Sequence, residues 1–209
     1  MILGQEEGKK MKTSRVALVT GGGGGIGAAI CRALAEAGHQ VAVADLNSDA
    51  AKKVAGEITG VGIEIDVARP DSVAEAVHAA DGTLGPIDVL VNCAGWDEFM
   101  PFIETDEAFQ RNVLEINLAG PMRLTRAVLP GMIERRWGRI INIASDAGRV
   151  GSSLESIYSG AKGGLIAFTK TIARETARNG ITANCVCPGP TDTPLLSRLG
   201  ESGERGKKM

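Results

Sequence analysis

A run of glycines near the start of the chain restricts what this sequence can fold into more than any other feature. The run extends from Gly21 to Gly27 and is interrupted only by Ile26. It follows a short, continuously apolar strand pattern at 15–20 and precedes a helical pattern closed by Gly38. Glycines let a backbone turn tightly and approach a pyrophosphate, and the N–H groups at the start of the next helix attract its negative charge. A mere flexible loop is the alternative, but the order of strand, turn and helix predicts a nucleotide site.

An acidic residue follows at the distance expected in a dinucleotide-binding fold. The second apolar strand pattern ends in Asp45, eighteen residues after Gly27. A carboxylate there would accept hydrogen bonds from the 2′- and 3′-hydroxyls of a ribose and would repel a 2′-phosphate. Leu46 follows the acid, and neither it nor the glycine turn offers an Arg or Lys for an extra phosphate. The pattern favours NAD over NADP, with a solvated carboxylate at the end of a strand as the alternative.

Strand and helix patterns alternate along the rest of the chain. The apolar runs lack polar alternation, as in a parallel sheet that helices cover on both faces, and they lie at 15–20, 41–45, 61–65, 88–91, 139–144 and 181–187. The helical patterns lie at 26–37, 48–58, 70–83, 105–135 with a bend near Gly120-Pro121, and 156–178. A chain of 209 residues with 44% apolar residues can bury one sizeable core. We therefore predict a single α/β domain with a doubly wound parallel sheet.

The only tyrosine of the chain, Tyr158, stands four residues before Lys162. On a helix this spacing puts the phenol and the ammonium on the same face. A free phenol has a pKa of about 10, and a fixed positive charge nearby lowers that pKa by favouring the phenolate. Taken alone, such a pair is more often a partly buried ring beside a solvated charge. With the nucleotide site, it indicates a phenol that passes protons.

In their order, these motifs resemble those of the short-chain dehydrogenase/reductase family from about 15 to 196. Thr20 and the glycine run match the family's TGxxxGxG, 92–95 matches its NNAG, and 188–193 matches its PGxxxT. The family's catalytic tetrad corresponds to Asn117, Ser145, Tyr158 and Lys162. The resemblance implies a Rossmann-type NAD-binding catalytic domain over 14–196 and an oxidoreductase that interconverts a secondary alcohol and a ketone. It leaves 1–13 as a flexible N-terminal segment.

The resemblance also implies a role for each residue of the tetrad. Ser145 would donate a hydrogen bond to the substrate oxygen, and Tyr158 would exchange the proton with that oxygen. Lys162 would lower the pKa of the phenol and bind the nicotinamide ribose, and Asn117 would hold a water that links the lysine to solvent. Seen singly, Ser145 could be a strand cap and Asn117 a polar group inside a helix. The implied cofactor-binding residues are Gly21, Gly25, Ile26, Gly27, Asp45, Asp66, Val67, Asn92, Ala94, Gly95, Tyr158, Lys162, Pro188, Gly189 and Thr193.

The sequence departs from the family pattern at two places. Cys93 replaces the second Asn of NNAG, an amide that helps to tie neighbouring strands together, and we expect a modest stability cost. The stretch 197–209 is glycine-rich and charged, and we expect it to be flexible and to begin the substrate loop, with the family's final helix and strand absent. Family members assemble through their two long helices, so the resemblance implies a homodimer or homotetramer.

The stretches 95–97, 128–132, 145–153 and 187–193 resemble the 2-hydroxycyclohexanecarboxyl-CoA dehydrogenase branch of the family. This resemblance implies oxidation of a cyclic 2-hydroxyacyl-CoA thioester to the ketone. Trp96 and Arg149 are candidate substrate contacts, or else a packing residue and a solvated charge. A 3-oxoacyl-[acyl-carrier-protein] reductase is the alternative enzyme, and a nucleotide-binding regulatory protein without turnover is the alternative outside enzymes.

Composition excludes several classes of partner. A net charge of −2 argues against a nucleic-acid surface, and no apolar stretch is long enough to span a membrane. The polar N-terminal residues lack a signal-peptide pattern, which predicts a cytoplasmic protein. We interpret the four cysteines as reduced core residues. Two isolated histidines, His39 and His78, provide too few ligands for a metal, so we expect none.

Overall fold

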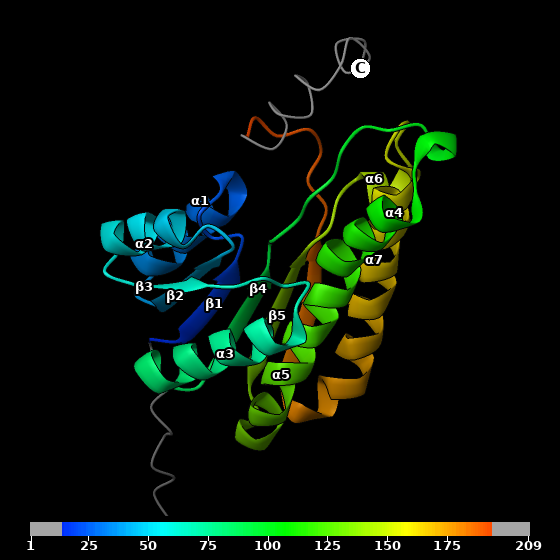
Figure 1. Cartoon of the computed structure of the whole chain (residues 1–209). Helices are drawn as coiled ribbons and strands as arrows, with labels where there is room; N and C mark the ends of the chain where they lie inside the picture. Colours follow the sequence, from blue (N-terminus) through cyan, green and yellow to red (C-terminus); the bar gives the residue numbers. More distant parts are fainter. Residues whose placement is uncertain (1–13, 194–209) are drawn as a thin grey trace, which may run out of the picture.

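The computed structural model describes residues 14–193, so the sequence-based predictions for 1–13 and 197–209 lie outside the described residues (Figure 1). Six parallel strands form one sheet in the order β3-β2-β1-β4-β5-β6. They are β1 Val16–Thr20, β2 Gln40–Asp45, β3 Val61–Glu64, β4 Val89–Asn92, β5 Gly138–Ile143 and β6 Ile181–Val186. The strand order runs outward from β1 to β3 on one side of the sheet and from β4 to β6 on the other, so it reverses between β1 and β4. In doubly wound folds this reversal point is where ligands bind, outside the carboxyl ends of the strands.

Helices cover both faces of the sheet, which confirms the predicted fold class (Figure 1). The α-helices are α1 Gly25–Glu36, α2 Ser48–Glu57, α3 Pro70–Leu84, α4 Glu107–Leu114, α5 Gly120–Arg135, α6 Ala147–Val150 and α7 Ser156–Thr176. Short 3-10 turns occupy Phe102–Glu104 and Ala177–Asn179. No helix within 14–193 is long and apolar enough to cross a membrane.

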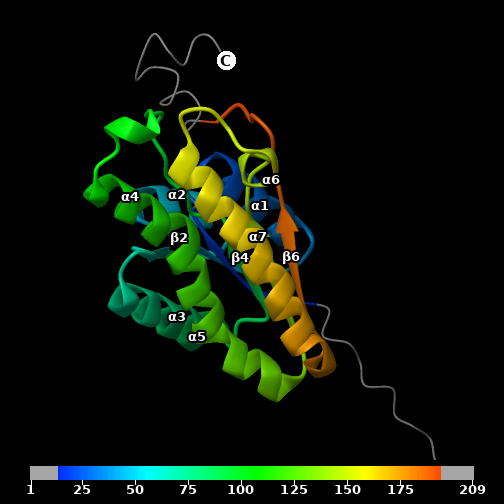
Figure 2. The same cartoon turned by 90° about the vertical axis from the view of Figure 1, so that its right-hand side faces the viewer.

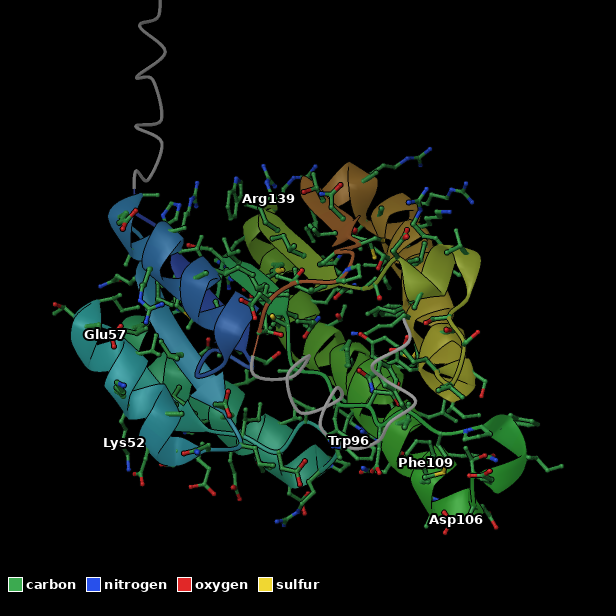
Figure 3. The ribbon with its side chains drawn as sticks, turned by 90° about the horizontal axis from the view of Figure 1, so that it is seen from above. Lys52, Glu57, Trp96, Asp106, Phe109 and Arg139 are labelled. Carbon is green, nitrogen blue, oxygen red and sulfur yellow. The ribbon has the colours of Figure 1, made fainter. Side chains whose placement is uncertain are left out.

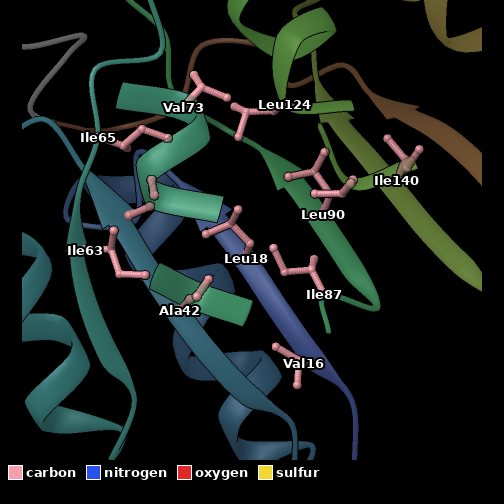
Figure 4. Close-up of a cluster of buried hydrophobic side chains, with 14 of the residues drawn as sticks. Val16, Leu18, Ala42, Ile63, Ile65, Val73, Ile87, Leu90, Leu124 and Ile140 are labelled. Atoms are coloured by element: carbon pink, nitrogen blue, oxygen red, sulfur yellow. The ribbon is translucent and has the colours of Figure 1, made fainter. Parts of the chain in front are cut away.

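Alternating residues of the central strands β1, β2 and β4 supply two separate cores. On one face, Leu18, Leu90 and Ile140 pack with residues of α3 and α5, as the close-up shows (Figure 4). On the other face, Val19 and Val43 pack with residues of α1 and α2. Since successive strand residues point to opposite faces, a fully apolar strand is needed to fill both cores. This requirement explains why the strand patterns lack polar alternation.

The sequence predicts one bent helix over 105–135, but the structure divides this range into three elements. α4 ends at Leu114, a π-helical turn runs from Glu115 to Ala119, and α5 begins at Gly120, so the predicted bend is a change of helix type. α7 lies beside this long element (Figure 2). The short helix α6 was also missed, because the sequence there is a mixture of Ser, Gly and charged residues without a helical apolar period.

Candidate active site

The glycine turn between β1 and α1 packs closely against itself and against the backbone after β4. Gly21 has a φ of +65°, and a Cβ added there would lie 2.9 Å from the backbone of Ala94. A Cβ at Gly27 would lie 2.1 Å from the carbonyl oxygen of Gly21. The first turn of α1 carries no acidic residue, and its N-cap, Gly24, has no side chain to occupy the N–H groups. This cradle fits a pyrophosphate group.

Asp45 lies beside the glycine turn, as the sequence predicts. Its Oδ2 accepts a hydrogen bond of 3.0 Å from the Gly23 N–H, and its Oδ1 accepts one of 2.9 Å from the Asn47 N–H. A carboxylate oxygen accepts more than one hydrogen bond, so the side chain keeps capacity for ribose hydroxyls. Its neighbour Leu46 is exposed.

A row of polar side chains joins the carboxyl ends of the central strands. The Thr20 hydroxyl accepts hydrogen bonds from the N–H groups of Cys93 and Ala94. Asn92 Nδ2 donates to Asn142 Oδ1 at 2.7 Å, and Asn142 Nδ2 donates to Thr169 Oγ1 on α7, also at 2.7 Å. This buried chain ties β4 and β5 to α7. Sequence reasoning missed Asn142 and Thr169, although an asparagine inside the apolar strand at 139–144 was a visible signal.

The four residues of the predicted tetrad come from three neighbouring elements. Ser145 follows β5, Tyr158 and Lys162 lie in the first two turns of α7, and Asn117 lies in the π-helical turn. Ser145 lies close enough to Tyr158 for its side chain to lower the pKa of the phenol, and Lys162 Nζ lies 5.4 Å from the centroid of the phenol ring. The ring and the ammonium therefore share one side of the helix, as their spacing predicts.

Asn117 is fully buried and held in one orientation. Its Nδ2 donates to the carbonyl oxygens of Trp96 at 2.7 Å and Val113 at 2.9 Å. A Cβ added at Gly95 would lie 3.1 Å from Asn117 Oδ1 and 3.7 Å from Lys162 Nζ. Gly95 thus lies between the amide oxygen and the ammonium. A larger residue at Gly95 would crowd both groups.

Burial sets the proton affinities of the phenol and the ammonium. It raises the pKa of Tyr158 to about 12, against a lowering effect of the Ser145 side chain. It lowers the pKa of Lys162 to about 8, although the nearby thiols of Cys93, Cys185 and Cys187 act in the opposite direction. The expectation that the ammonium makes the phenol acidic is therefore wrong for this structure. Desolvation has the largest effect on the pKa of the phenol, which holds its proton at neutral pH.

We predict that Lys162→Met makes the protein more stable at pH 7. The pKa of Lys162 is about 8 in the folded state against 10.5 for the free side chain, so between these values the unfolded chain binds more protons and stability rises with pH. Below pH 8 the wild type has the full penalty of a buried charge, about 3 kcal/mol. Urea unfolding at pH 7 and pH 9.5 should show a gain in the variant that shrinks at the higher pH. The exposed Lys170→Met on the same helix is the control, and an equal gain at both pH values contradicts the assignment.

The remaining predicted residues lie around this centre. Asp66 Oδ1 accepts from the Ala68 N–H, and Val67 is buried against Gly120. The carbonyl oxygen of Pro188 accepts a hydrogen bond of 3.0 Å from the Asp146 N–H, which joins the loop after β6 to the loop after β5. Gly25 and Ile26 open α1, and Gly189 and Thr193 follow Pro188 in its loop.

The two candidate substrate contacts, Trp96 and Arg149, differ in their surroundings. Trp96 packs edge to face on Phe109 with ring centroids 5.7 Å apart, and both lie at the same end of the molecule (Figure 3). Arg149 is an exposed residue that pairs with Asp146 at 3.0 Å. Within the described residues no cluster of His, Cys, Asp or Glu could hold a metal, and the four cysteines are free thiols.

Comparison with known proteins identifies the family of this chain. The profile of the short chain dehydrogenase family matches residues 15–203. The chain belongs to this family. The enzyme is therefore an oxidoreductase of a family that uses NAD(P).

Relatives with assigned names are also oxidoreductases. The enzyme is 43% identical to the acetoacetyl-CoA reductase of Shinella zoogloeoides, over 90% of this chain and 78% of that protein. It is 38% identical to the 3-oxoacyl-[acyl-carrier-protein] reductase FabG of Vibrio cholerae, over 90% and 78% of the two chains. A crystal structure of an actinorhodin polyketide ketoreductase variant with NADPH superposes with a TM-score of 0.87 at 38% identity, over 90% of this chain and 75% of that one.

Proposed function

We propose that the enzyme uses NAD to interconvert a secondary alcohol and a ketone on a hydroxyacyl-CoA thioester. The observation that carries this proposal is the position of Tyr158 and Lys162 on one side of α7, with Ser145 at the carboxyl end of β5, beside a glycine turn that fits a dinucleotide. The names of the relatives support the thioester, because they include an acetoacetyl-CoA reductase and a 3-oxoacyl reductase.

In this proposal each residue of the tetrad either transfers or stabilises a proton, or positions the cofactor or a water. The Ser145 hydroxyl donates a hydrogen bond to the substrate oxygen and stabilises the charge that develops there. In the reduction, Tyr158 gives its proton to that oxygen, and a phenol that stays protonated at neutral pH is ready to do so. Lys162 holds the nicotinamide ribose, and Asn117 positions the water that reaches the ammonium. A bound nicotinamide supplies or accepts the hydride.

The choice of NAD rests on Asp45, since a family member of known structure contains NADPH. The Asp45 carboxylate is fixed by the N–H groups of Gly23 and Asn47 at the end of β2. A 2′-phosphate placed there would meet a negative charge that cannot turn away, whereas ribose hydroxyls would meet hydrogen-bond acceptors.

We predict that Asp45→Ala relaxes this cofactor preference. A hydrogen bond to a charged group contributes about 1.5–3 kcal/mol, so the ratio of kcat/KM with NADP to that with NAD should rise by roughly 10–100-fold. Asp49→Ala removes an exposed carboxylate four residues away and should leave the ratio unchanged. An unchanged ratio in Asp45→Ala would remove the reason for proposing NAD.

The finer substrate class is part of the same proposal. The 2-hydroxycyclohexanecarboxyl-CoA branch would take a cyclic substrate, while the reductases named above point to linear 3-oxoacyl thioesters. Steady-state assays with cyclic 2-hydroxyacyl-CoA, 3-hydroxyacyl-CoA and simple cyclic alcohols, each with NAD and with NADP, separate these outcomes. Preference for a linear 3-oxoacyl substrate with NADPH would favour the 3-oxoacyl-[acyl-carrier-protein] reductase. Binding of NADH without turnover of any substrate would favour a regulatory protein.

We also propose the extent of the catalytic unit, its assembly and its compartment. Residues 14–196 would form the catalytic unit and 197–209 would begin the loop over the substrate. The partly exposed Leu114 and Ile133 on α4 and α5 support assembly as a homodimer or homotetramer through the long helices. Four free cysteines favour a reducing compartment, the cytoplasm.

A further inference from the structure

A single buried hydroxyl on α7 joins that helix to two strands, and the chemistry described so far makes no use of it. Thr169 is 3% exposed. Its Oγ1 donates a hydrogen bond of 2.7 Å to the Leu165 carbonyl oxygen one turn earlier and accepts one of 2.7 Å from Asn142 Nδ2 on β5. It also lies 3.1 Å from Cys185 Sγ on β6. Every hydrogen-bonding position of this hydroxyl is therefore occupied, two of them by other elements.

The one proton of the hydroxyl fixes the direction of the bonds around it. Because that proton goes to the Leu165 carbonyl oxygen, Thr169 can only accept from Asn142, whose amide must present its Nδ2 to the helix. The Asn142 Oδ1 is then left to accept from Asn92 Nδ2 at 2.7 Å. Asn142 is fully buried. Loss of the Thr169 hydroxyl would therefore leave a buried amide donor without its partner.

The same side of α7 makes a second polar contact with β5, and that contact belongs to the tetrad. Lys162 Nζ donates a hydrogen bond of 2.9 Å to the carbonyl oxygen of Ile143, the residue after Asn142. Lys162 is 3% exposed and precedes Thr169 by seven residues, about two turns of the helix. Leu165, between them in the sequence, is completely buried. Two polar contacts with adjacent residues of one strand thus hold α7 against β5.

Apolar packing alone would not fix the position of the helix along the strand. Burial of Leu165 is non-directional and tolerates a small shift of the helix, whereas a hydrogen bond requires both a distance and an angle. Tyr158 lies one turn before Lys162, whose Nζ is 5.4 Å from the centroid of the phenol ring. A shift of α7 would move both groups together. Misplacement of a reacting group by about 1 Å can lower a rate by roughly 100-fold.

We propose that Thr169 is a positioning residue: its hydrogen bond with Asn142 holds α7 against β5 and so fixes where the helix places its two tetrad residues. The inference rests on the roles proposed for those residues, Tyr158 and Lys162, and it does not depend on which alcohol or thioester the enzyme uses. Thr169 needs no contact with substrate or cofactor, because it acts through the placement of the helix.

The test replaces Thr169 with valine, which keeps the branched shape of the side chain and removes the hydroxyl. Thr176→Val is the matched control. Thr176 lies on the same helix, is also 3% exposed and donates to the Ile172 carbonyl oxygen at 2.7 Å, but within 14–193 it makes no hydrogen bond to a strand. Thr169→Ser retains the hydroxyl and tests whether it is sufficient.

The single tyrosine of the chain reports the position of α7 without any substrate. In protein that carries isotope-labelled tyrosine, the one set of ring signals in an NMR spectrum comes from Tyr158. We expect Thr169→Val to shift these signals, and Thr169→Ser and Thr176→Val to leave them near those of the wild type. Unshifted signals in Thr169→Val overturn the proposal, as does an equal shift in Thr176→Val.

Turnover should follow the same pattern. We expect kcat of Thr169→Val to fall by about 10–100-fold, while NADH affinity stays near that of the wild type because the glycine turn and Asp45 lie on other elements. Thr169→Ser should recover most of the rate, and Thr176→Val should keep it. Combining Asn142→Ala with Thr169→Val should cost no more than the larger of the two separate losses, since both remove the same hydrogen bond. Losses that multiply, or a serine variant as slow as the valine variant, contradict the proposal.

Thr169→Ala is the second variant without a hydroxyl, for the case in which the valine variant does not fold. If neither variant folds, Thr169 is a structural residue and the proposal is overturned. A wild-type protein that turns over no alcohol or thioester would refute the proposed function, while the Tyr158 signals would still show whether Thr169 places the phenol.

Discussion

Replacing Tyr158 with phenylalanine is expected to lower kcat by about 10²–10⁴-fold, the usual contribution of a positioned proton donor. The phenol is the proposed proton donor, and with a pKa of about 12 it is protonated throughout the neutral range. Phenylalanine keeps the ring and removes only the hydroxyl. The loss should therefore fall on the chemical step, with kcat and kcat/KM reduced together.

The measurement needs a second readout for the cofactor site. NADH affinity, followed by its fluorescence, should change by less than about twofold, because the glycine cradle and Asp45 are untouched. Thr171→Val removes a hydroxyl from the exposed side of the same helix and serves as the control. Turnover near the wild-type rate in Tyr158→Phe would refute the proposed proton transfer and leave only the fold and the nucleotide site.

Gly27→Ala is expected to weaken nucleotide binding strongly for a purely steric reason. The added Cβ would lie 2.1 Å from the carbonyl oxygen of Gly21, and a backbone oxygen cannot move aside as the end of a side chain can. We expect the variant to lose about 3 kcal/mol of stability, within the range of overpacked sites. If the bound turn has to accommodate the same strain, the Kd for NADH should rise about 100-fold.

Gly24 provides the matched control for this prediction. It belongs to the same turn, but a Cβ there would lie 3.6 Å from the Gly21 carbonyl oxygen, an ordinary contact, and its φ of −100° suits alanine. Gly24→Ala should therefore retain NADH binding and most of its stability in calorimetric titration and urea unfolding. Equal losses in both variants would show that the turn needs flexibility throughout and not space at Gly27.

Features encoded in short stretches of the sequence could be predicted. The glycine turn, the apolar strands and Asp45 each depend on neighbours within about twenty residues, and the structure confirms the doubly wound sheet and places the acid beside the turn. The spacing of Tyr158 and Lys162 likewise predicts their common side of α7. In these cases local periodicity and the demands of one turn are sufficient.

Features that depend on burial and on distant partners could not be predicted. Helical spacing says nothing about desolvation, so the raised pKa of Tyr158 and the lowered pKa of Lys162 follow only from the packed structure. The hydrogen bond between Asn92 and Asn142 joins residues fifty positions apart. Such contacts arise only when the whole chain has folded.

The π-helical turn limits how this protein can be redesigned. A turn with one extra residue rotates everything after it by about 100° relative to a regular α-helix. A helical wheel drawn through 107–135 therefore assigns the wrong faces to one half of the element. Deleting a single residue between 115 and 119 would restore the regular repeat and keep the faces of α4 and α5 in place, but it would remove the turn that carries Asn117. The number of residues at this point therefore matters for the position of Asn117, while the faces of the flanking helices tolerate its change.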